Sequence, residues 1–301
     1  MRMSWTLAIA LLAGLLAGLY WSDAWPNDTA APADHGFPES VVISMPDRSP
    51  LSFQGLVSRL ASADIVVLGE VHDNAEHHAA QAAIVRALNV EVGVAGLAFE
   101  MIRPDDEAAI ARARSEGRPL ADTLDWAGWP DFALYAPIFD AAPSALVTGG
   151  AFKREALRQF ASDLGAWPNA ERFQIDQPLP EAQMQRRMEE QVAAHCNAIP
   201  LEATPPMVAI QRLWDASFAN AALRAWEERR GLVVVIAGTG HADRRRAVPE
   251  MLIRARPDLR VISVGGLESD TPPARYAADA FDFAYTAPPA EREDPCLGFK
   301  K

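Results

Sequence analysis

The sequence predicts an α/β fold, with a mostly parallel sheet flanked by helices and a helical insert. Two short β-branched runs, Ile65–Leu68 and Leu232–Ala237, are each followed by a Gly-x-x-His motif. Such runs, bounded by glycine and turn residues, are typical of buried strands in a parallel sheet. Strand and helix signals alternate over residues 41–152, which favours βαβ units. With 301 residues, half of them hydrophobic, the chain can bury one large domain.

The first half of the chain supplies four predicted strands and the helices between them. We expect an edge strand at 41–45, which Pro46 ends, and a central strand at 65–68. Pro104 is followed by three acidic residues, a pattern typical of the first turn of a helix. Pro137 is expected to interrupt the helix that contains it. The other predicted strands are 96–99 and 145–148, and the predicted helices are 51–62, 74–88, one from Pro104 and 132–142.

The character of the chain changes after residue 152. No convincing strand signal occurs in residues 153–229, where three helices are predicted between prolines. Strand signals return at 232–237, at 260–264 and, more weakly, at 282–285. We therefore predict a sheet domain made of residues 41–152 and 230–301. The segment 153–229 is predicted to be a helical insert that acts as a lid, with helices at 154–162, 181–196 and 207–229.

The N-terminal segment predicts export. Arg2 precedes an uncharged apolar run of 15 residues, Trp5–Leu19. This run is short for a membrane-spanning helix and suits a signal peptide. Residues 1–24 are accordingly expected to be a signal peptide or an uncleaved membrane anchor, and 25–40 a linker. The protein would then be periplasmic, or anchored by this segment alone and facing the periplasm.

The chain contains two cysteines, Cys196 and Cys296. In an exported protein an even number of cysteines favours a disulfide, and two buried free thiols are the alternative. The formal net charge is −12, and no basic cluster typical of a nucleic-acid surface is present. The sequence therefore predicts no nucleic-acid partner.

Polar or glycine residues follow four of the predicted strands. They are Glu70 and His72 after the first strand of the site, Glu100 after the second, Gly149 after the third, and Gly240 and His241 after the fourth. Ligands of open α/β sheets collect at the carboxyl ends of the strands, so His72 and His241 are expected to face one pocket.

The residue types suit a metal centre. Glu70, His72, Glu100 and His241 are ligand types of a catalytic zinc, manganese or iron ion, and a spare carboxylate could act as a general base. Alternatives remain for each residue. The histidines could be core residues bonded to backbone, and Glu100 could form a buried salt bridge to an arginine.

Other residues in the pattern allow two interpretations. His77 and His78 are adjacent on a helix, so at most one faces the pocket, and a surface or capping role is the simpler expectation. An aromatic stretch from Trp126 to Tyr135 is either core or a flat wall for a planar ligand. In the second case Tyr135 could ligate haem iron, and Arg154 could neutralise a ligand carboxylate. His195 is expected to be structural.

These motifs resemble those of the ChaN-type haem-binding, iron-regulated lipoprotein family. The resemblance is carried by Leu68–Asn74, by Leu97–Met101, by the Trp- and Tyr-Pro segment 125–138, and by Ile236–His241. It covers residues 40–265 in order. The family is similar to a wider group that includes Tiki/TraB-type and erythromycin-esterase-like proteins, and some members of that group are metal-dependent hydrolases.

The resemblance implies an α/β sheet with a helical lid, a cell-envelope location, haem binding, an iron-acquisition role and a possible homodimer. Two features depart from the family pattern. No lipobox cysteine follows the apolar run, and Lys153 stands where a proline is expected before Arg154.

Two functional hypotheses follow. The favoured one is a haem-binding envelope protein, with Tyr135, Arg154, His78, Gly149 and Gly240 as cofactor-binding residues. The alternative is an esterase or protease that depends on a divalent transition metal and uses Glu70, His72, Glu100 and His241 as catalytic and metal-binding residues. A binding module with a vestigial site is a third possibility, against which the two intact motifs argue.

Overall fold

The computed structural model describes residues 35–38, 40–126, 128–271 and 273–299. The predicted signal peptide or anchor at 1–24, and most of the predicted linker at 25–40, lie outside these ranges. Among the described residues, no helix is both long enough and apolar enough to cross a membrane.

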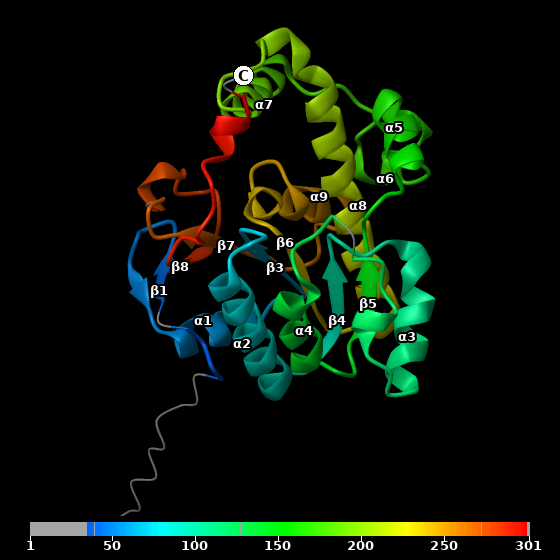
Figure 1. Cartoon of the computed structure of the whole chain (residues 1–301), viewed down its shortest axis with the longest axis vertical. Helices are drawn as coiled ribbons and strands as arrows, with labels where there is room; N and C mark the ends of the chain where they lie inside the picture. Colours follow the sequence, from blue (N-terminus) through cyan, green and yellow to red (C-terminus); the bar gives the residue numbers. More distant parts are fainter. Residues whose placement is uncertain (1–34, 39, 127, 272, 300–301) are drawn as a thin grey trace, which may run out of the picture. The chain divides into compact units, whose positions relative to one another are not determined.

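The described part of the chain forms an α/β fold around one eight-stranded sheet, which confirms the predicted fold class (Figure 1). The strand order is β2-β1-β8-β7-β3-β6-β4-β5, and every pair from β8 to β5 is parallel. The strands are β1 (Val41–Ser44), β2 (Pro50–Leu51), β3 (Ile65–Glu70), β4 (Val94–Phe99), β5 (Leu146–Gly149), β6 (Leu232–Gly238), β7 (Val261–Glu268) and β8 (Phe283–Ala287).

The strands carrying the two Gly-x-x-His motifs lie side by side in the middle of the sheet. Strand β3 pairs with β6 on one side and with β7 on the other, and all its residues are buried. β-branched residues dominate β3 and β6, as suits strands covered on both faces. This placement puts the ends of both motifs at the same edge of the sheet.

Two strand predictions need correction. The segment at 41–45 is not the edge, because the two-residue strand β2 pairs with its outer side. Strand β7 runs to Glu268, four residues beyond the prediction, through Gly265 and Gly266. A Cβ at Gly266 would lie 2.4 Å from the backbone oxygen of Gly69, so glycine here serves close strand packing.

Capping residues set several helix starts. Ser52 accepts a hydrogen bond from the Gly55 N–H before α1, and Asn74 accepts from Glu76 and His77 before α2. Pro137 does not interrupt α4, which continues to Ala141 because Ile138 and Phe139 are buried in the core. The α-helices of the described residues are α1 (Phe53–Leu60), α2 (Ala75–Glu91), α3 (Glu107–Ser115), α4 (Phe132–Ala141), α5 (Arg154–Ser162), α6 (Ala170–Phe173), α7 (Glu181–Ala194), α8 (Pro205–Arg229) and α9 (Val248–Ala255).

Two apolar layers cover the two faces of the sheet. Helices α1, α2 and α4 pack on one face, and α8 and α9 pack on the other (Figure 1). Helices α6 and α9 were not predicted from the sequence. Helix α8 contacts β4, β5 and β6 and buries Leu213, Phe218 and Leu223. The last part of the segment predicted as a lid is therefore a core helix of the sheet domain.

A disulfide joins Cys196, just after α7, to Cys296 near the C-terminus, as the sequence predicted. Their Cα atoms are 5.6 Å apart and 100 residues separate them in the chain. The bond fixes the end of α7 to the C-terminal segment that follows β8.

Candidate functional site

The two Gly-x-x-His motifs meet at the carboxyl edge of the sheet. Glu70 at the end of β3 is opposite Gly238 at the end of β6 in the parallel register. Two residues after Glu70 the chain reaches His72, and three residues after Gly238 it reaches His241. The structure therefore brings together the two histidines that the doubled motif predicted to share a pocket.

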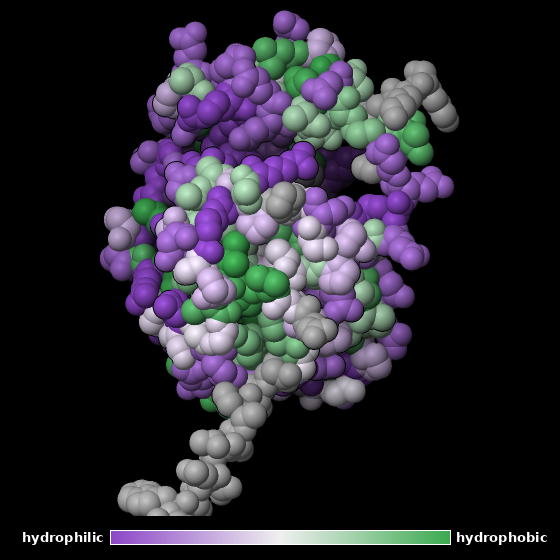
Figure 2. All heavy atoms as spheres, turned by 90° about the vertical axis from the view of Figure 1, so that its left-hand side faces the viewer, coloured by the Kyte–Doolittle hydropathy of each residue, from purple (hydrophilic) through white to green (hydrophobic). Residues whose placement is uncertain are grey.

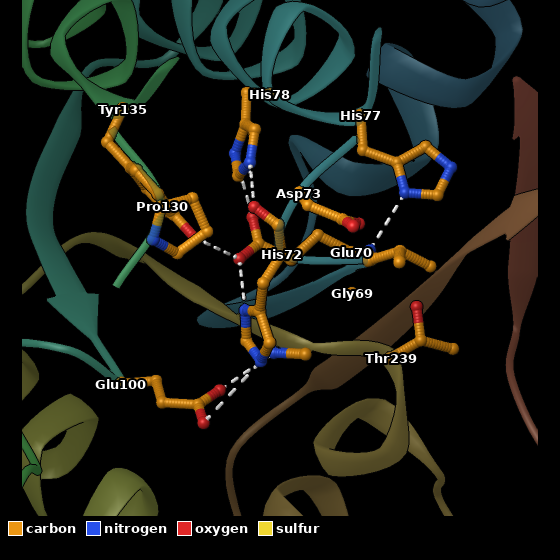
Figure 3. Close-up of polar contacts among 12 residues, drawn as sticks. Gly69, Glu70, His72, Asp73, His77, His78, Glu100, Pro130, Tyr135 and Thr239 are labelled. Carbon is orange, nitrogen blue, oxygen red and sulfur yellow. Dashed lines mark hydrogen bonds and ion pairs between the residues drawn. The ribbon is translucent and has the colours of Figure 1, made fainter. Parts of the chain in front are cut away.

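Glu70 is the centre of a buried hydrogen-bonded group (Figure 3). Its Oε1 lies 2.8 Å from Nδ1 of His72 and accepts a hydrogen bond of the same length from the Tyr135 hydroxyl. Its Oε2 lies 3.0 Å from Nδ1 of His78, whose Nε2 donates to the backbone oxygen of His72. We call Glu70, His72, His78 and Tyr135 the Glu70 cluster.

Hydrogen bonds decide the charge of this group. Burial alone would raise the pKa of Glu70, but its contacts with His72 and His78 outweigh burial and lower it to about 2. Burial opposes protonation of His72, yet the bond to Glu70 and the nearby charge of Glu100 raise its pKa. Burial, followed by the charge of Glu70, raises the pKa of Tyr135. The carboxylate is therefore ionised at neutral pH and the tyrosine is a neutral donor.

His241 is held in the same manner from the opposite side. Its Nδ1 lies 2.6 Å from Oδ1 of Asp215, a buried carboxylate on α8. Burial opposes its protonation, but the charges of Glu100 and Asp215 together raise its pKa. The ring also packs against Phe218, with centroids 4.9 Å apart. A carboxylate at Nδ1 fixes both the orientation and the tautomer of an imidazole.

Both imidazoles turn their Nε2 atoms toward Glu100. Oε1 of Glu100 lies 3.9 Å from Nε2 of His72 and 3.7 Å from Nε2 of His241. Oε2 accepts a hydrogen bond from the Gly238 N–H. Glu100 therefore faces two histidines and not an arginine, in contrast to the salt bridge considered from the sequence.

Glycines let the backbone come close at this site. A Cβ at Gly238 would lie 3.0 Å from Nε2 of His72, and one at Gly149 would lie 2.0 Å from the backbone oxygen of Ile102. Gly149 thus serves packing between β5 and the segment after β4. A Cβ at Gly240 would meet no atom within 4 Å, so open space lies beside that residue.

His77 and His78 have separate roles, and neither is on the surface. Nδ1 of His77 accepts from the Val71 N–H and its Nε2 donates to the backbone oxygen of Leu267. His78 contacts Glu70 instead, and both side chains are buried. The prediction that at most one of the two histidines faces the pocket agrees with this arrangement. The expected surface role is wrong, because α2 packs both rings against the ends of strands.

The remaining predicted cofactor residues lie in different surroundings. Tyr135 is fully buried with its hydroxyl bonded to Glu70, so it does not present its oxygen to a ligand here. Arg154 is exposed at the start of α5. Lys153, which precedes it, pairs with Asp105 at 2.6 Å. Within the Glu70 cluster, the side chain of His72 is the most exposed, at 37%, and Trp129 packs edge-on against it.

A cavity of about 430 Å³ lies at the ends of β4 and β5. Phe152 and Trp167 supply aromatic walls. Arg103, Lys153 and Arg224 also line it, and each is paired with an acidic residue. Ser217 also lines it, next to Phe218 on α8, the residue that packs on His241. Its volume lies within the range of small-molecule pockets.

The structure does not support the metal alternative. Within the described residues, no group of three or more His, Cys, Asp or Glu side chains is placed to hold a metal ion. Of the four proposed ligands, Glu70 pairs with His72, His241 pairs instead with Asp215, and Glu100 lies between the two imidazoles.

Sequence reasoning missed Asp215 and Arg187. Asp215 lies in α8 between Trp214 and Ala216, and an isolated acid in an apolar helix is costly unless it is paired. Asp215 therefore carries the same sequence signal as Glu100. No comparable signal identified Arg187, which lies among other charged residues of α7.

The sheet and its strand-end histidines define a class of α/β proteins with a polar site at the carboxyl edge. The chain matches the family described as haem-binding uptake, Tiki superfamily, ChaN, over residues 56–252. It therefore belongs to this family.

The chain is similar to several solved structures. A structure described as cofacial haem binding to ChaN of Campylobacter jejuni has a TM-score of 0.65 at 17% identity, covering 82% of this chain and 96% of that one. A succinoglycan biosynthesis protein gives 0.46 at 14% identity, with 78% and 74% covered. An erythromycin esterase variant in its open conformation gives 0.41 at 13% identity, with 86% and 85% covered. No curated protein matches the chain.

Proposed function

We propose that this protein binds haem at the carboxyl edge of the sheet and serves in haem or iron handling in the cell envelope. The observation that carries the proposal is the match to the haem-binding uptake family over residues 56–252. The fold similarity to ChaN of Campylobacter jejuni is consistent with it. The apolar N-terminal run and the disulfide support an envelope location.

The residues at the site fit the chemistry of haem. Imidazole is an axial ligand of haem iron, and His72 is the partly exposed imidazole of the Glu70 cluster. The Nδ1 contact with Glu70 would fix the ring and raise the basicity of the ligand. The aromatic walls of the 430 Å³ cavity suit a flat molecule. Haem would supply redox-active iron, while the protein binds and orients it.

A haemin titration of the purified full-length chain, followed by visible absorbance, tests the proposal. We expect a saturable Soret change at about one haem per chain. His72→Ala should shift the Soret band or weaken binding at least tenfold, while the matched control His195→Ala should leave both unchanged. Tyr135→Phe should change the spectrum less than His72→Ala, because the buried hydroxyl of Tyr135 contacts His72 only through Glu70. The absence of a saturable change in the wild type would overturn the proposal.

A second candidate function is supported by the position of Glu100 between two oriented imidazoles. His72 could accept a proton from water as its oxygen attacks an ester carbonyl, and protonated His241 could return one to the leaving alkoxide. This hydrolysis needs no metal, unlike the alternative predicted from the sequence. Hydrolysis of p-nitrophenyl acetate in EDTA tests it. We expect activity that falls at least 100-fold in His241→Ala, and an equal rate in that variant would exclude it.

A further inference from the structure

A small cavity lined by arginines lies between α7 and the loop that follows the second Gly-x-x-His motif. Its volume is about 160 Å³. Gln183, Arg186, Arg187 and Glu190 reach it from α7, and Arg245 and Arg246 reach it from the loop before α9. We call it the Arg187 cavity. In Figure 2 the upper part of the visible face, the end at which Figure 1 places α7, is largely hydrophilic.

Arg187 is buried with two of its nitrogens unused. The residue is 5% exposed, and Nη2 donates to the backbone oxygen of Arg246 at 2.8 Å. Its Nε and Nη1 have no hydrogen-bond partner among the described residues. A buried guanidinium without acceptors costs free energy, so these two groups call for an acceptor inside the cavity.

The charges around the cavity favour an anion. The loop arginines already have acidic partners: Arg245 forms two bonds to Asp243, and Nε of Arg246 lies 3.1 Å from Glu190. Asp215 and Glu250 are further carboxylates whose charges act on Arg187. Within the described residues, Nε and Nη1 of Arg187 nevertheless remain without a hydrogen-bond acceptor.

The cavity is connected to the candidate site. Asp215, which orients His241, is among the charges that act on Arg187. Its second oxygen, Oδ2, is buried and has no hydrogen-bond partner in the described part of the chain. Only Ala242, Asp243 and Arg244 separate His241 from Arg245 along the sequence. The loop that lines the cavity therefore continues directly from the second Gly-x-x-His motif.

We propose that the Arg187 cavity is a binding site for one oxyanion, a carboxylate or a phosphate group. Charge-assisted hydrogen bonds from Nε and Nη1 of Arg187 hold the anion, and the loop arginines add positive charge. The volume admits one such group and excludes a porphyrin ring. A haem propionate is one source of the carboxylate, and that assignment rests on the proposed function. Inorganic phosphate is the other source, and the anion site itself does not depend on haem.

Thermal unfolding of the full-length chain with inorganic phosphate tests the anion site without haem. We expect phosphate to raise the Tm of the wild type at constant ionic strength, and the shift to disappear in Arg187→Met. Arg158→Met, which removes an exposed arginine on α5, is the matched control and should retain the shift. Arg187→Lys keeps the charge, so it provides a second variant if the methionine variant does not fold. No shift in the wild type, or an equal shift in Arg187→Met, would overturn the site.

Haemin and haemin dimethyl ester then distinguish the two sources. If a propionate occupies the cavity, the wild type binds haemin at least tenfold more tightly than the ester, and Arg187→Met binds the two alike. If phosphate depends on Arg187 but the two porphyrins bind the wild type equally, the site takes free phosphate and the propionate assignment is wrong. If neither porphyrin binds the wild type, the proposed function fails, while the phosphate result still decides the anion site.

Discussion

The Glu70 cluster and the Arg187 cavity are both buried and charged, but they differ in how their charges are satisfied. Oε1 of Glu70 accepts from Tyr135 and contacts His72, and Oε2 lies 3.0 Å from His78, so each carboxylate oxygen faces a histidine or tyrosine of the fold. Arg187 has one backbone acceptor and two unused donors. The first arrangement stabilises the folded state without a ligand, whereas the second lacks an acceptor that the fold does not supply.

The partners of a buried charge indicate whether it serves the fold or a ligand. Two imidazoles in contact with Glu70 give its side chain the task of orienting His72 and His78. Arg187 has no comparable side-chain partner among the described residues, which is the cost that the proposed anion would relieve. Removing each charge in turn should therefore change stability by different amounts.

Removal of Glu70 should have the largest effect on stability. Glu70→Ala leaves His72, His78 and Tyr135 without their common acceptor, and breaking a buried charge network by removing one partner costs about 3–5 kcal/mol. Urea unfolding at pH 7 measures the loss. Glu70→Gln, which keeps an oxygen acceptor and the side-chain volume, should lose less. Equal stability of Glu70→Ala and the wild type would show that the cluster does not stabilise the fold.

The stability lost when Glu70 is replaced should depend on pH. The pKa of Glu70 falls from 4.5 to about 2 on folding, so its ionised form contributes stability above pH 4.5 that is lost as the pH falls toward 2. The histidine pKa values are raised from 6.5, so their contribution is present below pH 6.5 and is lost as the pH rises through the folded-state pKa.

We therefore expect the stability difference between the wild type and Glu70→Gln to be greatest between about pH 5 and 6. A shift of this size in Glu70 corresponds to roughly 3 kcal/mol, because one pKa unit is about 1.4 kcal/mol. Unfolding free energies at pH 3, 5.5 and 8 measure the profile. A difference that stays constant over this range would show that the charge of Glu70 is not stabilised by folding.

Removal of the disulfide tests whether α7, which lines the Arg187 cavity, opens more readily than β3, which carries Glu70. Replacing both Cys196 and Cys296 with serine frees the end of α7 from the C-terminal segment, and loss of a native disulfide typically costs about 2–4 kcal/mol. Hydrogen exchange should show faster exchange in α7 than in β3, because β3 is held on both sides. Uniform faster exchange across α7 and β3 would show that the two regions open together.

Much of the sheet could be predicted because its central strands carry their own signal. The β-branched runs of β3 and β6 end at glycines, and the doubled motif indicated that His72 and His241 lie together. Strand β2 was missed because two residues carry no periodicity. The end of β7 was missed because Gly265 and Gly266 serve contacts with Phe281, Gly69 and Tyr285, which only the folded chain brings near.

Site residues at the ends of strands could be predicted from the sequence, whereas the residues that contact them could not. Glu100 was identified because a carboxylate that ends an apolar strand needs a partner. The choice between an arginine and two histidines as that partner depends on tertiary packing. The separate directions of His77 and His78 follow from how α2 lies on β3 and β7, which their adjacency in sequence does not specify.

Removal of Arg187 should have the smallest effect on stability, and it tests the comparison most directly. Arg187→Met replaces a buried guanidinium by a shorter, unbranched apolar side chain, so the one hydrogen bond lost is that to the Arg246 backbone. Replacing a buried charge by an apolar residue is often neutral or stabilising. In phosphate-free buffer we expect a change within about 1 kcal/mol, in either direction, by urea unfolding. A loss approaching that of Glu70→Ala would show that Arg187 already has its full set of partners, and that both buried charges serve the fold alone.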